Sequence, residues 1–300
     1  MPNRLTNIQA FFQRELSGVA GFKELRDQLY QRINQRPEAT IYAIMLSWVF
    51  EQQGDFANAL RQAKALDKRQ NENGNRIYRL AQTAVREKQY DVGIQAYQYI
   101  IDEKGSDSPY YIDSKRYVLI AKRTQLVEGY TYTHDQLLQL EDEYKAYIDE
   151  FGRSFNTAII MQEMAELQAF YLDSLDNAIA VLEEVIQMPE LSRLARAEAK
   201  LDLGDYYLMQ GEVWESTLLY SQVDKAMKDA PLGEVARYKN AKLSYYKGDF
   251  EWAQDQLDIL KGSTSELISN DAIDLSVFIL EHYALDTTQR PMEMYARAEL

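Results

Sequence analysis

The sequence predicts an all-α solenoid of about seven antiparallel helix pairs stacked in series. Two segments, 197–230 and 234–263, place small and aromatic residues at matching positions 37 residues apart. Amphipathic stretches fill the rest of the chain, and only residues 130–133 (Tyr-Thr-Tyr-Thr) alternate with a strand-like period. Repeated helix pairs are stacking units, so the pattern predicts a recognition surface rather than a catalytic centre.

Small residues indicate where the two helices of a pair cross. Two helices approach to ~8 Å only where a side chain at the contact is small, and a glycine at the turn supplies the left-handed residue that ends the first helix. The predicted crossings are at Ala59, Ala121, Ala178, Gly204, Ser216, Ala241 and Ala253. The side chains expected to fill the space toward the next pair are Tyr97, Tyr144, Tyr220 and Leu257.

The helix pairs follow one another in chain order, separated by prolines that end one helix or begin the next. Between the second and third pairs the offset is 34 residues, as from Ala59 to Gly93. The separating prolines are Pro37, Pro109, Pro189, Pro231 and Pro291. The predicted pairs are 5–16 with 22–35, 38–53 with 56–69, 76–87 with 91–102, 111–127 with 135–151, 154–171 with 175–187, and the two matching segments, followed by an eighth that begins at 269–285 and restarts at Pro291.

Three regions are predicted from this order. Residues 1–37 form a divergent N-terminal pair, residues 38–268 form the repeats with an insertion near 129–133, and residues 269–300 form an incomplete repeat. A repeat array needs a polar cap over its last apolar face, and none is visible near the C-terminus. We therefore expect a piece of a longer protein, or self-association in which another copy covers this end.

Composition and charge exclude several classes of function. The net charge is −14, and residues 151–300 hold 13 Lys/Arg against 26 Asp/Glu, so no concentrated basic face is expected for nucleic acid or for anionic membranes. The chain has no cysteine, hence no disulfide or thiolate metal site. It has neither an apolar run of ~18–20 residues nor a signal peptide. These features indicate a soluble protein without membrane insertion, either cytoplasmic or periplasmic.

The residues that carry catalytic chemistry are sparse. His134 and His282, the two histidines, have no partners at a metal-binding spacing, and a surface or packing role is expected for each. Acid pairs such as Asp173/Asp176 work as acid and base only in a desolvated cleft, and on exposed helices they are solvated charge. No catalytic residue, metal site or cofactor is predicted, and the chain is expected not to be an enzyme.

These residues give the chain a family resemblance. Residues 203–207 (Leu-Gly-Asp-Tyr-Tyr) with Gly211, Ser216 and Tyr220 resemble the tetratricopeptide-repeat (TPR) motif, and Ala241 with residues 248–253 is the next closest copy. The chain is similar to long bacterial TPR proteins of the Bacteroidetes kind, although most copies lack the consensus Trp and closing Pro. The resemblance implies a right-handed solenoid whose first helices line a concave groove that holds a peptide or a partner domain.

The predicted partner-binding positions lie on the first helices. Aromatic and Arg side chains are favoured binding anchors, and the alternative is that the tyrosines among them pack between repeats. The predicted groove residues are Trp48, Gln52, Tyr78, Gln82, Arg86, Lys122, Tyr238, Lys242 and Tyr245. These positions do not repeat the Lys and Asn pattern of grooves that grip a C-terminal carboxylate, so that mode of binding is not expected.

The sequence therefore predicts a protein–protein interaction scaffold, with three alternatives left open. They are a structural spacer within a longer chain, an enzyme or small-molecule binder on an α-solenoid frame, and a helical-repeat RNA binder with a hidden basic stripe. The stretch 141–190 carries 12 Asp/Glu against Lys145 and Arg153. It indicates a basic partner, or alternatively a solubilising convex face.

Overall fold

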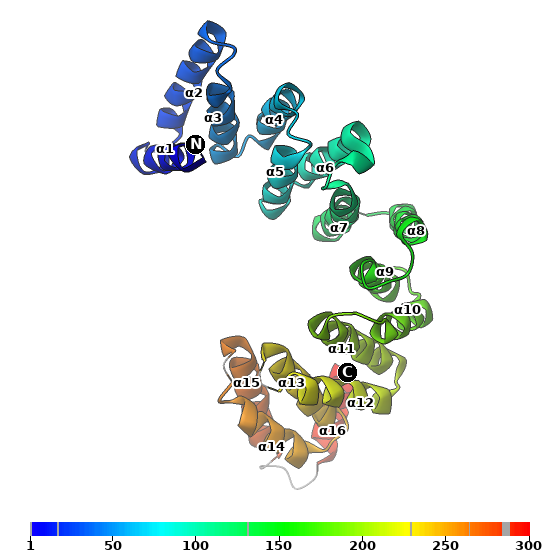
Figure 1. Cartoon of the computed structure of the whole chain (residues 1–300). Helices are drawn as coiled ribbons and strands as arrows, with labels where there is room; N and C mark the ends of the chain where they lie inside the picture. Colours follow the sequence, from blue (N-terminus) through cyan, green and yellow to red (C-terminus); the bar gives the residue numbers. More distant parts are fainter. Residues whose placement is uncertain (1, 17, 131, 229, 264, 284–288) are drawn as a thin grey trace. The chain divides into compact units, whose positions relative to one another are not determined.

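The computed structural model describes residues 2–16, 18–130, 132–228, 230–263, 265–283 and 289–300. Within these residues the chain forms sixteen α-helices and one short 3₁₀ helix, and no strand (Figure 1). No helix in this described part is both long and apolar enough to cross a lipid bilayer. The prediction of an all-α chain of paired helices is confirmed.

The chain divides into two compact units, residues 1–143 (unit 1) and 144–300 (unit 2), with the boundary inside α8. The helices up to this boundary are α1 (Pro2–Glu15), α2 (Gly18–Gln35), α3 (Thr40–Gln52), α4 (Phe56–Gln70), α5 (Asn75–Arg86), α6 (Tyr90–Lys104), α7 (Tyr111–Gly129) and α8 (His134–Phe151). Those beyond it are α9 (Ala158–Tyr171), α10 (Leu175–Gln187), α11 (Arg193–Gln210), α12 (Val213–Ala226), α13 (Pro231–Tyr246), α14 (Phe250–Leu260), α15 (Glu266–Tyr283) and α16 (Arg290–Glu299).

Successive helices pack on one another from α2 to α7 in unit 1 and from α9 to α15 in unit 2, as stacking units require, whereas α16 packs on α13. The predicted boundaries agree with the helices to within a few residues. The region near 129–133 expected as an insertion is the connection between α7 and α8, and much of the extra length lies in α7 itself, which has 19 residues. Residue 131 and residues 284–285 of the predicted last repeat lie outside the described part.

Backbone conformation explains where the hairpins turn. Gly54, Gly211 and Gly248 have φ values of +70°, +90° and +83°, in the left-handed region that ends the first helix of a pair. Lys88 and Asp173 take the same conformation without glycine, with φ values of +58° and +51°. The turn glycines were therefore recognisable from sequence, and the turns at these two residues, which the predicted helix pairs also place, form without a glycine.

The small residues predicted at helix crossings are buried. Each of the seven has almost no exposed surface, and so do the larger residues expected beside them. A Cβ atom at Gly204 would lie 2.4 Å from Cε1 of Tyr220, closer than atoms pack. The Oγ of Ser216 donates to the carbonyl of Gly204 at 2.7 Å. Gly204 thus lies at a tight crossing of α11 and α12, as predicted.

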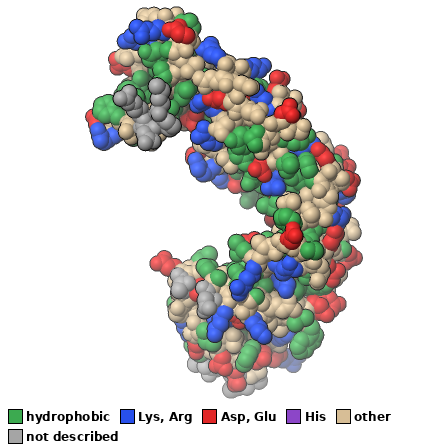
Figure 2. Space-filling view, in the orientation of Figure 1, with side chains coloured by type: hydrophobic (Ala, Val, Ile, Leu, Met, Phe, Trp, Pro, Cys, Tyr) green, Lys and Arg blue, Asp and Glu red, His purple; other side chains and the backbone are tan. Residues whose placement is uncertain are grey.

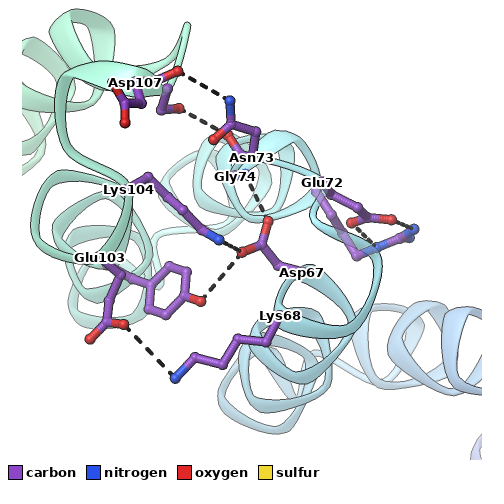
Figure 3. Close-up of polar contacts among 11 residues, drawn as sticks. Asp67, Lys68, Glu72, Asn73, Gly74, Glu103, Lys104 and Asp107 are labelled. Atoms are coloured by element: carbon purple, nitrogen blue, oxygen red, sulfur yellow. Dashed lines mark hydrogen bonds and ion pairs between the residues drawn. The ribbon is translucent and has the colours of Figure 1, made fainter.

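A buried polar cluster joins successive hairpins in unit 1 (Figure 3). Asp67, which has no exposed surface, accepts a hydrogen bond from the backbone N–H of Gly74 at 2.7 Å. The Nζ of Lys104 lies 2.5 Å from the other carboxylate oxygen, to which the Tyr99 hydroxyl donates at 3.3 Å. Beside this cluster the Oγ of Ser108 donates to the carbonyl of residue 73 at 2.9 Å. The carboxylate therefore ties the end of α4 to the start of α5 and to α6.

The C-terminal helix α16 covers part of the last apolar face. Met292 and Ala296 are buried in the core that α13, α14 and α15 form. The expectation that this end has no cover is therefore wrong in part. Exposed apolar side chains remain on α15, at Leu267, Ile273, Val277 and Leu280.

Candidate functional site

Unit 1 has a pocket of about 440 Å³ on the side of its first helices, between α1, α3 and α5. Trp48 forms part of its wall, and its ring lies 5.9 Å from that of Phe22. Arg76 and Arg79 give the pocket positive charge. Burial raises the pKa of Glu51, which lines the same pocket, against the opposing effect of Arg76. The pocket can accept an apolar side chain together with a polar or anionic group.

Tyr78 belongs to a cluster of tyrosines. Its ring stacks on Tyr110 at 4.7 Å and meets Tyr97 edge-on at 5.8 Å. Burial raises the pKa of Tyr78 to about 12. The alternative interpretation, that such tyrosines pack between repeats, describes Tyr78 best, because these contacts join α5 and α6 to the residue that precedes α7.

The other predicted positions of unit 1 differ in their availability. Gln52, Gln82 and Arg86 are exposed, and the Arg86 side chain keeps 74% of its surface in solvent. The Nζ of Lys122, by contrast, lies 2.6 Å from Oε2 of Glu143, an ion pair between α7 and α8. Lys122 is therefore engaged within the protein, while the other three side chains are exposed, with only a 3.9 Å ion pair between Arg86 and the adjacent Glu87.

Unit 2 has a pocket of about 560 Å³ formed mainly by its first helices. Phe170 of α9, Leu208 and Met209 of α11, and Tyr246 of α13 contribute apolar surface. Phe170 and Met209 keep about half of their surface exposed, 54% and 50%, so they are available to a ligand. An apolar pocket with a few polar groups is the usual form of a binding site.

An ion pair forms one wall of this pocket. The Nζ of Lys239 lies 2.7 and 2.8 Å from the two carboxylate oxygens of Asp205, and the Tyr220 hydroxyl donates to the same carboxylate at 2.6 Å. The contact joins α11, α12 and α13.

Asp202 lies on the same helix as Asp205 and has an unusual environment. Burial raises its pKa to about 6, and the nearby carboxylates of Asp205, Glu166 and Glu198 act in the same direction, while Lys239 opposes them. The first-helix side of α9 and α11 is therefore strongly acidic, in contrast to the arginines in the pocket of unit 1.

The three predicted residues of α13 lie beside α16. Tyr238 and Lys242 are half-buried and line a pocket of about 270 Å³ that also includes Tyr295 and Glu299. Tyr245 has no exposed surface, and its hydroxyl donates to Glu299 at 3.0 Å. The prediction that Tyr245 is open to a partner is wrong, because α16 covers this position.

Sequence reasoning missed the apolar residues of the larger pocket, Phe170, Leu208 and Met209. Leu208 and Met209 follow Asp205 by three and four residues and so share its helix face. Both residues lie about one helical turn after the predicted crossing at Gly204, so the helix periodicity could have identified Leu208 and Met209. Phe170 comes from the preceding pair, and its sequence context carries no comparable signal.

The two histidines lie apart from any acidic cluster that could hold a metal ion in the part of the chain that the structure describes. His134 is exposed, and the His282 ring lies 4.4 Å from that of Phe278. In the described ranges no three His, Cys, Asp or Glu side chains gather as a metal-binding group.

No protein-family model matches the sequence, and no curated protein is similar to it. Several solved structures are similar in fold. The APC/C hetero-tetramer Cut9-Hcn1 aligns with a TM-score of 0.50 and 13% identity over 91% of this chain and 53% of that chain. A tetratricopeptide repeat protein from Parabacteroides merdae aligns with a TM-score of 0.49 and 12% identity over 92% and 98%. TPR-like repeats of a putative kinesin light chain from Podosopora anserina align with a TM-score of 0.49 and 18% identity over 63% and 96%. At such identities the likeness concerns the fold.

Proposed function

The chain has the fold of tetratricopeptide-repeat proteins, and on that premise we propose that it is a non-enzymatic scaffold that binds a peptide or protein partner on its first-helix faces. The observation that carries the proposal is the pocket of about 560 Å³ in unit 2. Its apolar wall includes Phe170 and Met209, both about half exposed. An aromatic ring buries a large apolar area against a partner, and a flexible methionine adapts its shape to the side chain that it meets.

Exposed polar side chains on the first helices of unit 1 also support a peptide or protein partner. Gln52, Gln82 and Arg86 lie on first helices in solvent, and Arg79 lines the unit 1 pocket. Backbone and side-chain oxygens of a peptide are natural acceptors for these donors. Each unit thus offers its own first-helix surface.

The charge of unit 2 favours a partner that is neutral or basic overall. Unit 2 holds 14 Lys/Arg and 28 Asp/Glu, and acidic side chains lie along its lower edge in Figure 2. Such a field accelerates encounter with a basic partner and disfavours an acidic one. Self-association through the C-terminal end stays a prediction, and its candidate surface is the exposed apolar side of α15.

The proposal is tested by comparing two exposed apolar residues of unit 2. Proteins captured from native cell extract by the full chain should be lost with Met209→Glu, because a charge in the pocket rejects an apolar anchor. They should be retained with Ile259→Glu on the second helix α14, where 60% of the side chain is exposed. Mass spectrometry of the retained proteins gives the readout.

Either of two results would contradict the proposal. Equal capture by the native chain and by Met209→Glu would remove the unit 2 pocket as the binding surface. Capture of nothing by the native chain would favour a spacer that joins domains without gripping a partner. Tyr78→Ala is not a suitable test, because it would disrupt the tyrosine cluster as well as the surface.

A further inference from the structure

The C-terminal helix α16 lies on the first-helix face of unit 2. The Glu299 carboxylate accepts a hydrogen bond from Tyr245 at 3.0 Å and lies 3.7 Å from the Nζ of Lys242. The Tyr295 ring lies 5.2 Å from the Phe278 ring of α15. Lys242 and Tyr245 are positions that the sequence assigns to partner binding. An internal helix therefore occupies part of the proposed binding face.

The direction of α16 follows from contacts at its two ends. Glu299 lies beside Lys242 and Tyr245, whereas Glu293 lies beside Gly248, where an added Cβ would be 3.2 Å from its Cγ. The helix thus runs antiparallel to α13. No other second helix in the described residues contacts the first helix of the preceding pair as extensively as α16 contacts α13.

The end of α16 leads to the larger pocket of unit 2. Leu300 lines the pocket of about 560 Å³ together with Phe170 and Met209. Lys242 lines both this pocket and the pocket of about 270 Å³ beside Tyr295 and Glu299. The covered part of the face and the open pocket are therefore neighbouring parts of one surface.

The contacts of α16 define what this surface recognises. Met292 and Ala296, four residues apart, are the buried apolar positions. Glu299 follows three residues later and meets a lysine and a tyrosine hydroxyl. Burial and the hydrogen bond to Glu299 raise the pKa of Tyr245, so its hydroxyl is a neutral donor at physiological pH.

We propose that α16 is an internal occupant of the partner-binding face, and that the partner is an amphipathic helix of the same pattern. Such a helix carries two apolar residues four apart, a carboxylate three residues later, and an apolar side chain that enters the open pocket. The inference rests on the proposed function and adds its regulation, because the partner has to displace α16 before it binds α13. A tethered helix competes at a high effective concentration, so it suppresses weak partners.

The test releases α16 in the full chain and supplies its sequence from outside. Ala296→Glu places a charge at a fully buried position of α16, whereas Ala298→Glu places it at an exposed one and is the matched control. A fluorescent peptide of residues 289–300 should bind Ala296→Glu at least tenfold more tightly than the native chain or Ala298→Glu. Hydrogen exchange should show α16 exposed and α13 still protected in Ala296→Glu.

Three results would overturn the proposal. Loss of protection throughout α13 and α15 in Ala296→Glu would make α16 an integral part of the core. A released α16 without gain in peptide affinity would mean that the face does not recognise this pattern. A native dimer that becomes monomeric in Ala296→Glu would place α16 on a second copy. The probe is the protein's own sequence, so any of these results leaves capture that depends on Met209, and with it the proposed function, standing.

Discussion

Unit 1 and unit 2 are both built from antiparallel helix hairpins, but the polar and aromatic contacts between successive hairpins differ. In unit 1, rings of Tyr78, Tyr97 and Tyr110 pack together and the fully buried Asp67 pairs with Lys104. Unit 1 carries 19 Lys/Arg and 19 Asp/Glu, whereas unit 2 carries 14 and 28. Stacking therefore requires small residues at the crossings and apolar helix faces, which both units have. The polar contacts between hairpins, which we call polar joints, and the surface charge can differ.

The polar joints are the sharpest contrast. In unit 2, Asp205 pairs with Lys239 and Tyr220, but its side chain keeps 35% of its surface exposed. Solvent shares in stabilising such a pair, whereas a buried ion whose partner is removed stays uncompensated. The two units thus place the same chemistry in different dielectric surroundings.

The largest expected effect follows from this contrast. Asp67→Ala should lower the free energy of unfolding of unit 1 by about 3–5 kcal/mol, because Lys104 and the N–H of Gly74 lose their buried partner. Asp205→Ala should cost unit 2 only about 1–2 kcal/mol. Hydrogen exchange in the full chain measures each unit separately, and the exposed Asp102→Ala is the control for α6. Equal costs for the two aspartates would remove the distinction between the joints.

The helix crossings offer a second comparison. Gly204→Ala should destabilise unit 2 by about 1–3 kcal/mol, because the new Cβ meets the buried Tyr220 ring at 2.4 Å. Gly93→Ala in unit 1 should cost less, because its Cβ has one very close neighbour, Cγ2 of the half-buried Val85 at 2.5 Å, whereas three atoms of the Tyr220 ring lie within 3.1 Å at Gly204. Gly262→Ala, with only one atom within 4 Å, is the control. Thermal and denaturant midpoints report the order, and a reversed order would show that Tyr220 yields more readily than Val85.

A smaller effect depends on pH and is confined to unit 2. The pKa of Asp202 is raised to about 6 from 3.8, so the folded state binds the proton more tightly than the unfolded state. The resulting stability is fully present below about pH 3.8 and is lost as the pH rises through 6. Asp202→Asn should therefore stabilise unit 2 by about 1–2 kcal/mol at pH 7.

The difference between Asp202→Asn and the native chain should shrink as the pH falls from 7 to 4. Denaturant unfolding at several pH values, followed by hydrogen exchange of α11, measures it. Unit 1 serves as an internal control, since it should respond equally in both proteins. A difference independent of pH would mean that carboxylate ionisation is not the cause.

Much of the fold was accessible from sequence, and the candidate sites were less so. The hairpin turns at Gly54, Gly211 and Gly248 were identified because a turn glycine is a local signal, and the crossing at Gly204 because small residues recur 37 positions apart. Groove positions followed from helix periodicity, which indicates the side of a helix that a residue faces. Periodicity does not indicate what lies opposite that side, which is why Tyr245 was assigned to an open groove.

The sequence by itself determined the helices and their turns, because each depends on side chains within one or two helical turns, and it located the small residues at the crossings through their recurrence along the chain. Only the tertiary structure decided that Asp67 meets Lys104, that Phe170 and Met209 share a pocket, and that α16 covers α13. These contacts join residues 37 to 57 positions apart. They require whole hairpins to dock in register, and that depends on the summed packing of many side chains rather than on any local pattern.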